Sequence, residues 1–226
     1  MCGRFALYTD PLALAKKFQA ENAPELLPSY NVAPSQAIPI IRQKQGHRIF
    51  AMTRWGLIPS WTKEINTGYS TINARAETVA EKPSFRSAFQ HRRCLIPADG
   101  FFEWQEIATS KIKQPWYISL KNQEPMPLAG LWEHWQGKDG SESESCTIIV
   151  TSGNELMQSI HDRMPVILSP ENWDSWLDTA NTNKQGLQTL LTQYPADEMT
   201  AWPVSTVVNS PRHNGEECIG RVAGVG

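Results

Sequence analysis

Residues 93–105 read RCLIPADGFFEWQ and contain two short runs that favour β-strands, Arg93–Ile96 and Phe101–Gln105. Apolar and aromatic runs of this length are more typical of strands than of helices. Similar segments lie on both sides of this stretch, at residues 4–8, 38–42, 48–55, 116–120, 128–132, 147–151 and 165–168. Strands therefore dominate the predicted fold.

Helices are expected to be few and well capped. Asp10-Pro11 begins one that runs to about Gln19, because Asp is a good N-cap and Pro suits the first helical position. The same signal begins a second at Ser169–Trp176. Shorter helices are predicted at residues 84–90, 154–160 and 183–191. Long βαβ alternation is absent, so the predicted fold class is α+β, with a mainly antiparallel sheet or β-barrel-like core and a few peripheral helices.

Two polar stretches, residues 108–114 and 136–145, separate predicted strands and are expected to be surface hairpin loops. We find no internal repeat and no low-complexity linker long enough to divide the chain. The sequence therefore predicts a single domain over residues 1–226.

The composition excludes several classes of protein. No run of about twenty apolar residues could span a membrane, and residues 1–5 lack a secretory signal profile. We therefore expect a cytoplasmic protein. Its net charge of −2 counts against an extended surface for polyanions but allows a local basic cleft.

The four cysteines show neither a CxxC pair nor metal-ligand spacing with histidines, so we expect reduced thiols, no metal and no disulfide framework. Cys94 and Cys146 lie in strand-like apolar runs and are predicted to be buried structural thiols.

Cys2 differs from the other three cysteines because removal of Met1 would make it N-terminal. Its amine and thiol would then have pKa values of about 8 and 8.5, so each has a reactive fraction near neutrality. Such a 1,2-aminothiol condenses with an aldehyde to an imine, on which the thiol closes a thiazolidine. The same residue could instead attack an amide carbonyl, or simply begin a strand.

Three further segments carry polar side chains suited to carbonyl chemistry. Asn73 and Arg75 would face the same side of an extended segment and could hold a carbonyl or phosphate oxygen together, unless Asn73 lies in a turn and Arg75 pairs with Glu77. Glu103 lies between aromatic residues, where burial would raise its pKa and suit a general acid, although strand alternation could equally expose it.

The third segment is Ile160–Pro165, in which His161 can transfer a proton near neutral pH and Arg163 can bind phosphate. A structural role for the histidine is an equally open interpretation. Together, the segments supply a nucleophile, an oxygen-binding pair, an acid and an imidazole.

Six ordered motifs resemble the SOS-response-associated peptidase (SRAP) family, over Cys2 to about Ser205. They are MCGRF (1–5), YNVAP (30–34), WGLIP (55–59), INARAET (72–78), PADGFFEW (97–104) and HDRMP (161–165). The resemblance implies an α+β domain with a β-barrel-like core that acts on abasic sites in single-stranded DNA.

The resemblance also implies roles for particular residues. The Cys2 amine would attack C1′ of the abasic sugar, and the thiol would close a thiazolidine crosslink. Glu103 would shuttle protons, Asn73 would orient the sugar and the Cys2 amine, and His161 would act at a sugar hydroxyl. Weak lyase activity by β-elimination and autoproteolytic release of the residue before Cys2 are also implied.

For DNA binding, the resemblance implies phosphate contacts by Arg4, Arg75 and Arg163, and a DNA path lined by Asn31, Pro34 and Trp61. It implies no metal and no small-molecule cofactor. Capture of one lesion requires only a monomer, and a place near the nucleoid or replication fork is expected.

Two alternatives remain on the sequence. The first is an N-terminal-nucleophile amidohydrolase or cysteine peptidase, which also requires a free Cys2. The second is a non-enzymatic reader of modified bases, which would bind intact DNA regardless of Cys2.

Overall fold

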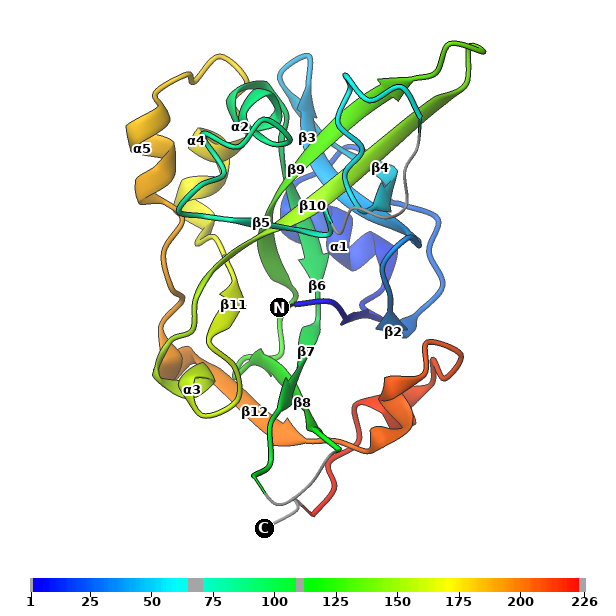
Figure 1. Ribbon diagram of the computed structural model, residues 1–226, viewed down its shortest axis with the longest axis vertical. Helices are drawn as coiled ribbons and strands as arrows, with labels where there is room; N and C mark the ends of the chain where they lie inside the picture. The colour runs from blue at the N-terminus through cyan, green and yellow to red at the C-terminus, as the bar shows by residue number, and fades with distance from the viewer. Residues whose placement is uncertain (1, 65–70, 109–111, 224–226) are drawn as a thin grey trace.

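The computed structural model describes residues 2–64, 71–108 and 112–223. Its centre is a closed barrel of five strands (Figure 1). The strands are β3 (Ala37–Lys44), β4 (His47–Trp55), β6 (Arg93–Ala98), β9 (Met126–Gln136) and β10 (Glu142–Ser152). Four of the five pairings are antiparallel: β3–β4, β3–β6, β6–β9 and β9–β10. The parallel pairing of β10 with β4 closes the ring. The predicted fold class is thereby confirmed.

A second, five-stranded sheet packs below the barrel in the view of Figure 1. All its pairings are antiparallel, in the order β12–β8–β7–β1–β2. The strands are β1 (Phe5–Leu7), β2 (Ser29–Val32), β7 (Gly100–Gln105), β8 (Gln114–Leu120) and β12 (Met199–Pro203).

The stretch 93–105 joins these two sheets, because β6 belongs to the barrel and β7 to the second sheet. Asp99 stands between them, and its carboxylate accepts hydrogen bonds from the Tyr8 N–H at 2.5 Å and the Thr9 N–H at 2.8 Å. At Gly100 an added Cβ would lie 2.3 Å from Cζ of Tyr117, so only glycine lets β7 and β8 approach this closely. This corner sets the position of β7 relative to the barrel.

Two three-residue strands extend the barrel sheet from opposite edges of β10. Strand β5 (Asn73–Arg75) runs parallel to it, and β11 (Arg163–Pro165) runs antiparallel. Both place a residue opposite Val150. Segments that are some ninety residues apart in the chain therefore flank the same strand.

The helices lie outside the sheets, as predicted. Helix α1 (Pro11–Phe18) begins after Asp10, whose carboxylate accepts hydrogen bonds from two backbone N–H groups of its first turn. Asn154 and Asn183 cap α3 and α5 in the same way. The other helices are α2 (Arg86–His91), α3 (Glu155–Gln158), α4 (Trp173–Leu177) and α5 (Lys184–Thr189), with 3-10 turns η1 (Pro170–Asn172), η2 (Ala196–Glu198), η3 (Thr206–Asn209) and η4 (Glu216–Cys218).

Several predicted boundaries were wrong. The strand expected at residues 165–168 is β11, which ends at Pro165, and beyond it Ile167 makes one isolated bridge to Leu128. The polar stretch 136–145 is largely strand, because β9 and β10 continue their pairing to Gln136 and Glu142. The predicted loop 108–114 lies partly outside the described residues, and Gln114 already belongs to β8.

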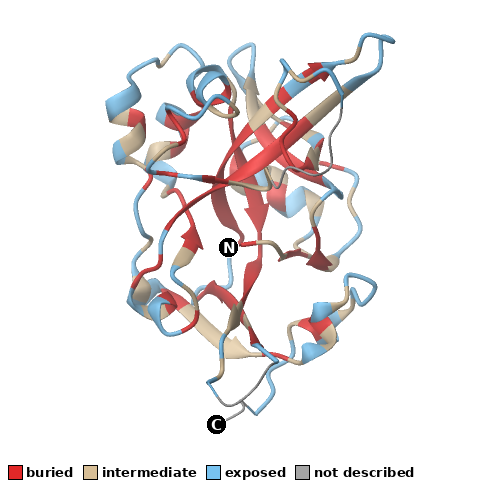
Figure 2. Cartoon of the chain, in the orientation of Figure 1, coloured by how far each residue is buried: buried red, intermediate tan, exposed pale blue. Residues whose placement is uncertain are grey.

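The core fills the barrel and the space between it and the helices (Figure 2). Cys94 in β6 and Cys146 in β10 are fully buried free thiols, as predicted. No helix in the described part of the chain is long and apolar enough to cross a membrane.

Candidate active site

The four predicted catalytic residues come from four elements around the N-terminal strand. Cys2 immediately precedes β1, Asn73 begins β5, Glu103 lies in β7 and His161 precedes β11. Strand β7 pairs with β1, and both β5 and β11 pair with β10. The N-terminus accordingly lies among these strands, near the middle of the molecule (Figure 1).

Asn73 is joined directly to Cys2. Its Nδ2 donates a hydrogen bond to the Cys2 carbonyl oxygen at 2.8 Å. This bond fixes the orientation of the amide, because a carbonyl oxygen can only accept. The Asn73 Oδ1 is buried and has no hydrogen-bond partner, so it can accept an N–H or O–H from a bound group.

Cys2 is completely buried and belongs to the main hydrophobic core. Burial raises the pKa of its thiol, and the nearby Glu103 carboxylate raises it further. The resting side chain is therefore a thiol and not a thiolate.

Glu103 faces the interior and is only 2% exposed, which decides between the two orientations that strand alternation allowed. Burial raises its pKa from 4.5 to about 7, and the negative charge of Asp162 acts in the same direction. Near neutral pH its protonated and ionised forms are both populated, so it can give or take a proton.

His161 lies next to Glu103, with Nε2 3.9 Å from the Glu103 Oε2. Its Nδ1 accepts a hydrogen bond from the Arg163 backbone N–H at 3.0 Å and lies 2.9 Å from the Asp162 Oδ1. Burial lowers the pKa of His161, so the neutral ring prevails at pH 7. Because Nδ1 accepts the Arg163 N–H in that state, Nε2 carries the proton, on the side of Glu103.

The three predicted phosphate-binding arginines lie on the elements that carry the catalytic residues. Arg4 is two residues from Cys2, Arg75 is two residues beyond Asn73, and Arg163 begins β11. Arg75 is exposed, while Arg163 donates to the Glu77 carboxylate at 2.5 Å. Glu77 therefore forms its ion pair with Arg163, while the charge of Arg75 also helps to lower the pKa of Glu77.

Arg4 is held by the second sheet and the C-terminal segment. Its NH1 donates to the Asn31 Oδ1 at 2.7 Å and to the Val208 carbonyl at 2.8 Å, and its guanidinium lies over the Trp104 ring. Asn31 itself is buried, and its amide also donates to the Val208, Ser210 and His213 carbonyls. Both ends of the Asn31 amide are therefore engaged within the protein: Oδ1 accepts from Arg4, and Nδ2 donates to backbone carbonyls.

The other two residues predicted to line a DNA path differ in exposure. Pro34 is half-buried in the loop after β2, and Trp61, in the loop after β4, is 65% exposed. The loop of Pro34 is tied to the end of β4, because the Ser35 N–H donates to the Trp55 carbonyl. The roles of Pro34 and Trp61 in DNA binding stay predictions.

Comparison with known proteins identifies the family of this chain. Residues 1–211 match the profile described as SOS response associated peptidase (SRAP). The chain belongs to the SRAP family. Abasic site processing protein YoqW of Bacillus subtilis (strain 168) is 47% identical over 222 residues, which cover 97% of this chain and 99% of that protein. Abasic site processing protein HMCES of Rattus norvegicus is 32% identical, covering 96% of this chain and 71% of its own.

The SRAP fold is confirmed by a solved structure as well. A crystal structure of a protein from Bacteroides thetaiotaomicron superposes with a TM-score of 0.88 at 29% identity, covering 98% of this chain and all of that one. The resemblance predicted from the six motifs is therefore correct.

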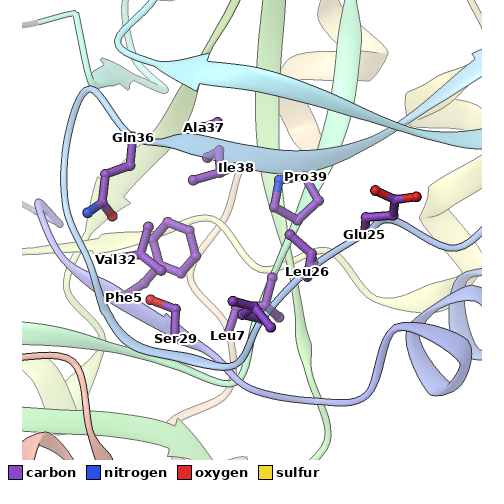
Figure 3. A pocket seen from close by; sticks show the side chains of 11 residues that line it. Phe5, Leu7, Glu25, Leu26, Ser29, Val32, Gln36, Ala37, Ile38 and Pro39 are labelled. Atoms are coloured by element: carbon purple, nitrogen blue, oxygen red, sulfur yellow. The ribbon is translucent and has the colours of Figure 1, made fainter.

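A cavity of about 270 Å³ lies between β1, β2 and the start of β3 of this SRAP chain (Figure 3). Its walls are mainly apolar, with Phe5, Val32 and Ile38 on one side and Leu26 on the other. None of the four catalytic candidates lines it. In the described residues no group of three or more His, Cys, Asp and Glu side chains could hold a metal ion.

Sequence reasoning assigned no role to Asp162 or Arg54, and it named Glu77 only as an alternative partner for Arg75. Asp162 contacts the His161 ring, and Glu77 holds Arg163. Asp162 and Glu77 both lie inside the six motifs, close to residues with a predicted role, and that position could have marked them as part of the site. Arg54 immediately precedes the WGLIP motif and gave no such signal.

Proposed function

We propose that this protein captures abasic sites in single-stranded DNA by forming a thiazolidine between Cys2 and the lesion. The observation that carries the proposal is the junction of Asn73 with the Cys2 backbone beside Glu103, a buried carboxyl with a pKa of about 7. The names of the relatives, abasic site processing proteins, support the same substrate class.

The reaction begins with loss of Met1, because the Cys2 nitrogen is an unreactive amide while Met1 is attached. The free amine adds to the C1′ aldehyde of the ring-opened sugar to give a carbinolamine. Loss of one water gives the imine. The Cys2 thiol then adds to the imine carbon, its proton passes to the nitrogen, and the thiazolidine ring closes. No oxidant, reductant or metal takes part.

The raised pKa of the thiol supports this order of steps. A thiol that rests protonated is a poor first nucleophile, whereas the neutral fraction of the amine can attack at once. The same property disfavours a cysteine peptidase mechanism, which begins with a thiolate. Autoproteolytic removal of Met1 before capture, and weak β-elimination at the imine after it, belong to the proposal as further reactions of the same residues.

Glu103 is proposed as the proton shuttle. In its protonated form it donates to the sugar oxygen as the ring opens and to the departing hydroxyl of the carbinolamine. In its ionised form it accepts the proton of the thiol during closure. A pKa of about 7 lets one carboxyl perform both tasks at cellular pH.

Asn73 and His161 position the reactants. The Asn73 Oδ1 is proposed to accept a hydrogen bond from the Cys2 amine or a sugar hydroxyl, which would direct the amine lone pair to C1′. The proton on Nε2 of His161 lies toward Glu103 and is proposed to bind a sugar hydroxyl.

Arg4, Arg75 and Arg163 are proposed to bind phosphates on either side of the lesion, with Pro34 and Trp61 along the strand. For Asn31 the proposed role is indirect, because its side chain is engaged in holding Arg4. A single chain carries every proposed group, so a monomer suffices.

The test is the intact mass of the denatured protein after incubation with a single-stranded oligonucleotide containing one abasic site. The expected product has lost Met1 and carries the oligonucleotide minus one water. Cys2→Ala should give no adduct, whereas the control Cys218→Ala, which alters another buried thiol, should give the native yield.

Cys2→Ser separates imine formation from ring closure. Serine retains the amine, so an adduct should appear only when borohydride reduces the imine. A stable adduct without borohydride would contradict thiazolidine closure. Absence of any adduct from the native protein, with turnover of an amide substrate, would favour the amidohydrolase; tight binding of intact DNA that is indifferent to Cys2 would favour a reader of bases.

A further inference from the structure

Arg54 lies near the end of β4, between the loop that contains Pro34 and the segment that leads to Asn73. Its NH2 donates to the Ser35 Oγ at 2.8 Å, next to Pro34, and its NH1 donates to the Gly56 carbonyl at 3.2 Å. Gly56 in turn adjoins Ile72, since a Cβ added to Gly56 would lie 3.8 Å from the Ile72 Cγ2. Asn73 follows directly.

The guanidinium of Arg54 has no carboxylate partner among the described residues, unlike those of Arg42, Arg48, Arg92 and Arg163. Its two hydrogen bonds go to neutral oxygens, which orient the fork without cancelling its charge. They engage two of its five N–H donors and leave the remainder for an external acceptor.

The backbone around Arg54 is shaped to keep this position open. Gly56 has φ +123°, and a Cβ there would lie 3.0 Å from the Arg54 NH1. Ser35 has φ +72°, a conformation unusual for a residue with a side chain, and its N–H donates to the Trp55 carbonyl at 2.8 Å. The positive φ angles of Ser35 and Gly56 thus accompany the contact between the Ser35 hydroxyl and the Arg54 guanidinium.

We propose that Arg54 and Ser35 form a further binding site for a DNA phosphodiester, on the Pro34 side of the lesion. Because the Ser35 Oγ accepts from Arg54, its own hydrogen can point to the phosphate together with the remaining N–H groups of Arg54. The site deepens the proposed function, on which it rests, by adding a phosphate contact outside the Arg4, Arg75 and Arg163 group.

The experiment measures non-covalent binding, so that it does not depend on crosslinking. The probe is a short single-stranded oligonucleotide with a tetrahydrofuran abasic analogue, which has no aldehyde. Arg54→Gln should weaken binding about threefold to tenfold at low salt and reduce the slope of log affinity against log salt by about 0.7.

Arg48→Gln is the matched control. Arg48 lies on the same strand and loses the same charge, but it is paired with Asp174. Its affinity and salt slope should stay at the native values. Arg54→Lys should retain the salt slope and recover part of the affinity, because a lysine supplies the charge but not the fork. Ser35→Ala should weaken binding without changing the slope.

A series of oligonucleotides with one neutral methylphosphonate each locates the phosphate. At one position the substitution should weaken native binding but not weaken Arg54→Gln further. The proposal is overturned if folded Arg54→Gln or Arg54→Lys keeps native affinity and slope and no position shows this coupling. Native crosslinking with that result would leave the proposed function intact, whereas a normal Arg54 effect without crosslinking would leave only the phosphate site.

Discussion

Glu103 shows how one side chain acquires its chemistry from its surroundings. A carboxyl in water is ionised at neutral pH, but burial on the inner side of β7 brings the pKa of this one to about 7. The aromatic residues on either side in the sequence are consistent with either orientation, and only the pairing of β7 with β1 and β8 turns Glu103 inward.

Replacement of Glu103 by glutamine should slow crosslinking by about 10² or more while leaving non-covalent DNA binding near native. In the native protein the rate should fall as pH rises through about 7, because the acid needed for ring opening is lost. The variant should lack that decline. Initial rates from denaturing gels across this range provide the measurement, and equal rates for the two proteins would remove the proton-shuttle role.

The same carboxyl should cost stability. Its pKa is higher in the folded than in the unfolded chain, so its favourable contribution is complete below pH 4.5 and is lost as pH rises through about 7. Relative to native, Glu103→Gln should gain on the order of 3 kcal/mol in free energy of unfolding between these limits. Urea titrations at about pH 5 and about pH 8 test the sign; a gain that is larger at the lower pH contradicts it.

At the scale of elements, the corner between β6 and β7 connects the barrel to the strand that carries Glu103. Asp99 ties it to residues 8 and 9, and Gly100 allows Tyr117 to pack on the backbone. The predicted strands on both sides were correct, whereas the three-residue strand β5 was recognised only as an extended segment. So short a strand has no hydrophobic period of its own and forms because β10 offers it an edge.

Gly100→Ala should destabilise the protein by about 1–3 kcal/mol, because its Cβ would lie 2.3 Å from Cζ of Tyr117. Gly220→Ala is the control, since its Cβ would meet nothing nearer than the Glu217 carbonyl oxygen at 3.7 Å. Chemical denaturation of both variants measures the difference. Equal midpoints would show that the corner can relax without disturbing β7.

For the molecule as a whole, a net charge of −2 is compatible with nucleic-acid binding only if the basic groups are gathered locally. The arginines at positions 4, 75 and 163 lie on elements beside the catalytic group, and Arg54 lies next to the Pro34 loop. In the proposed function, these few charges attract the DNA, and the covalent bond to Cys2 makes the complex persist.

Capture should accordingly depend on salt while retention does not. Four phosphate contacts predict a slope of about −3 for log affinity against log salt with the tetrahydrofuran oligonucleotide. An adduct formed at low salt should survive transfer to high salt and to denaturant. Titrations at several salt concentrations, followed by a denaturing gel of the preformed adduct, test both statements; dissociation of the adduct at high salt contradicts the covalent mechanism.

The amino-acid sequence by itself determined the family, most strands, the helix cap at Asp10, and the capacity of an N-terminal Cys2 to react with an aldehyde. These depend on residue type and local spacing, which a linear chain displays directly. The tertiary structure decided the parallel closure of β10 on β4, the inward orientation of Glu103, the hold of Asn31 on Arg4 and the Arg54–Ser35 contact. Each of these features depends on which strands, distant in the sequence, become neighbours. That pairing is determined by the burial of apolar side chains from the whole chain in one main core.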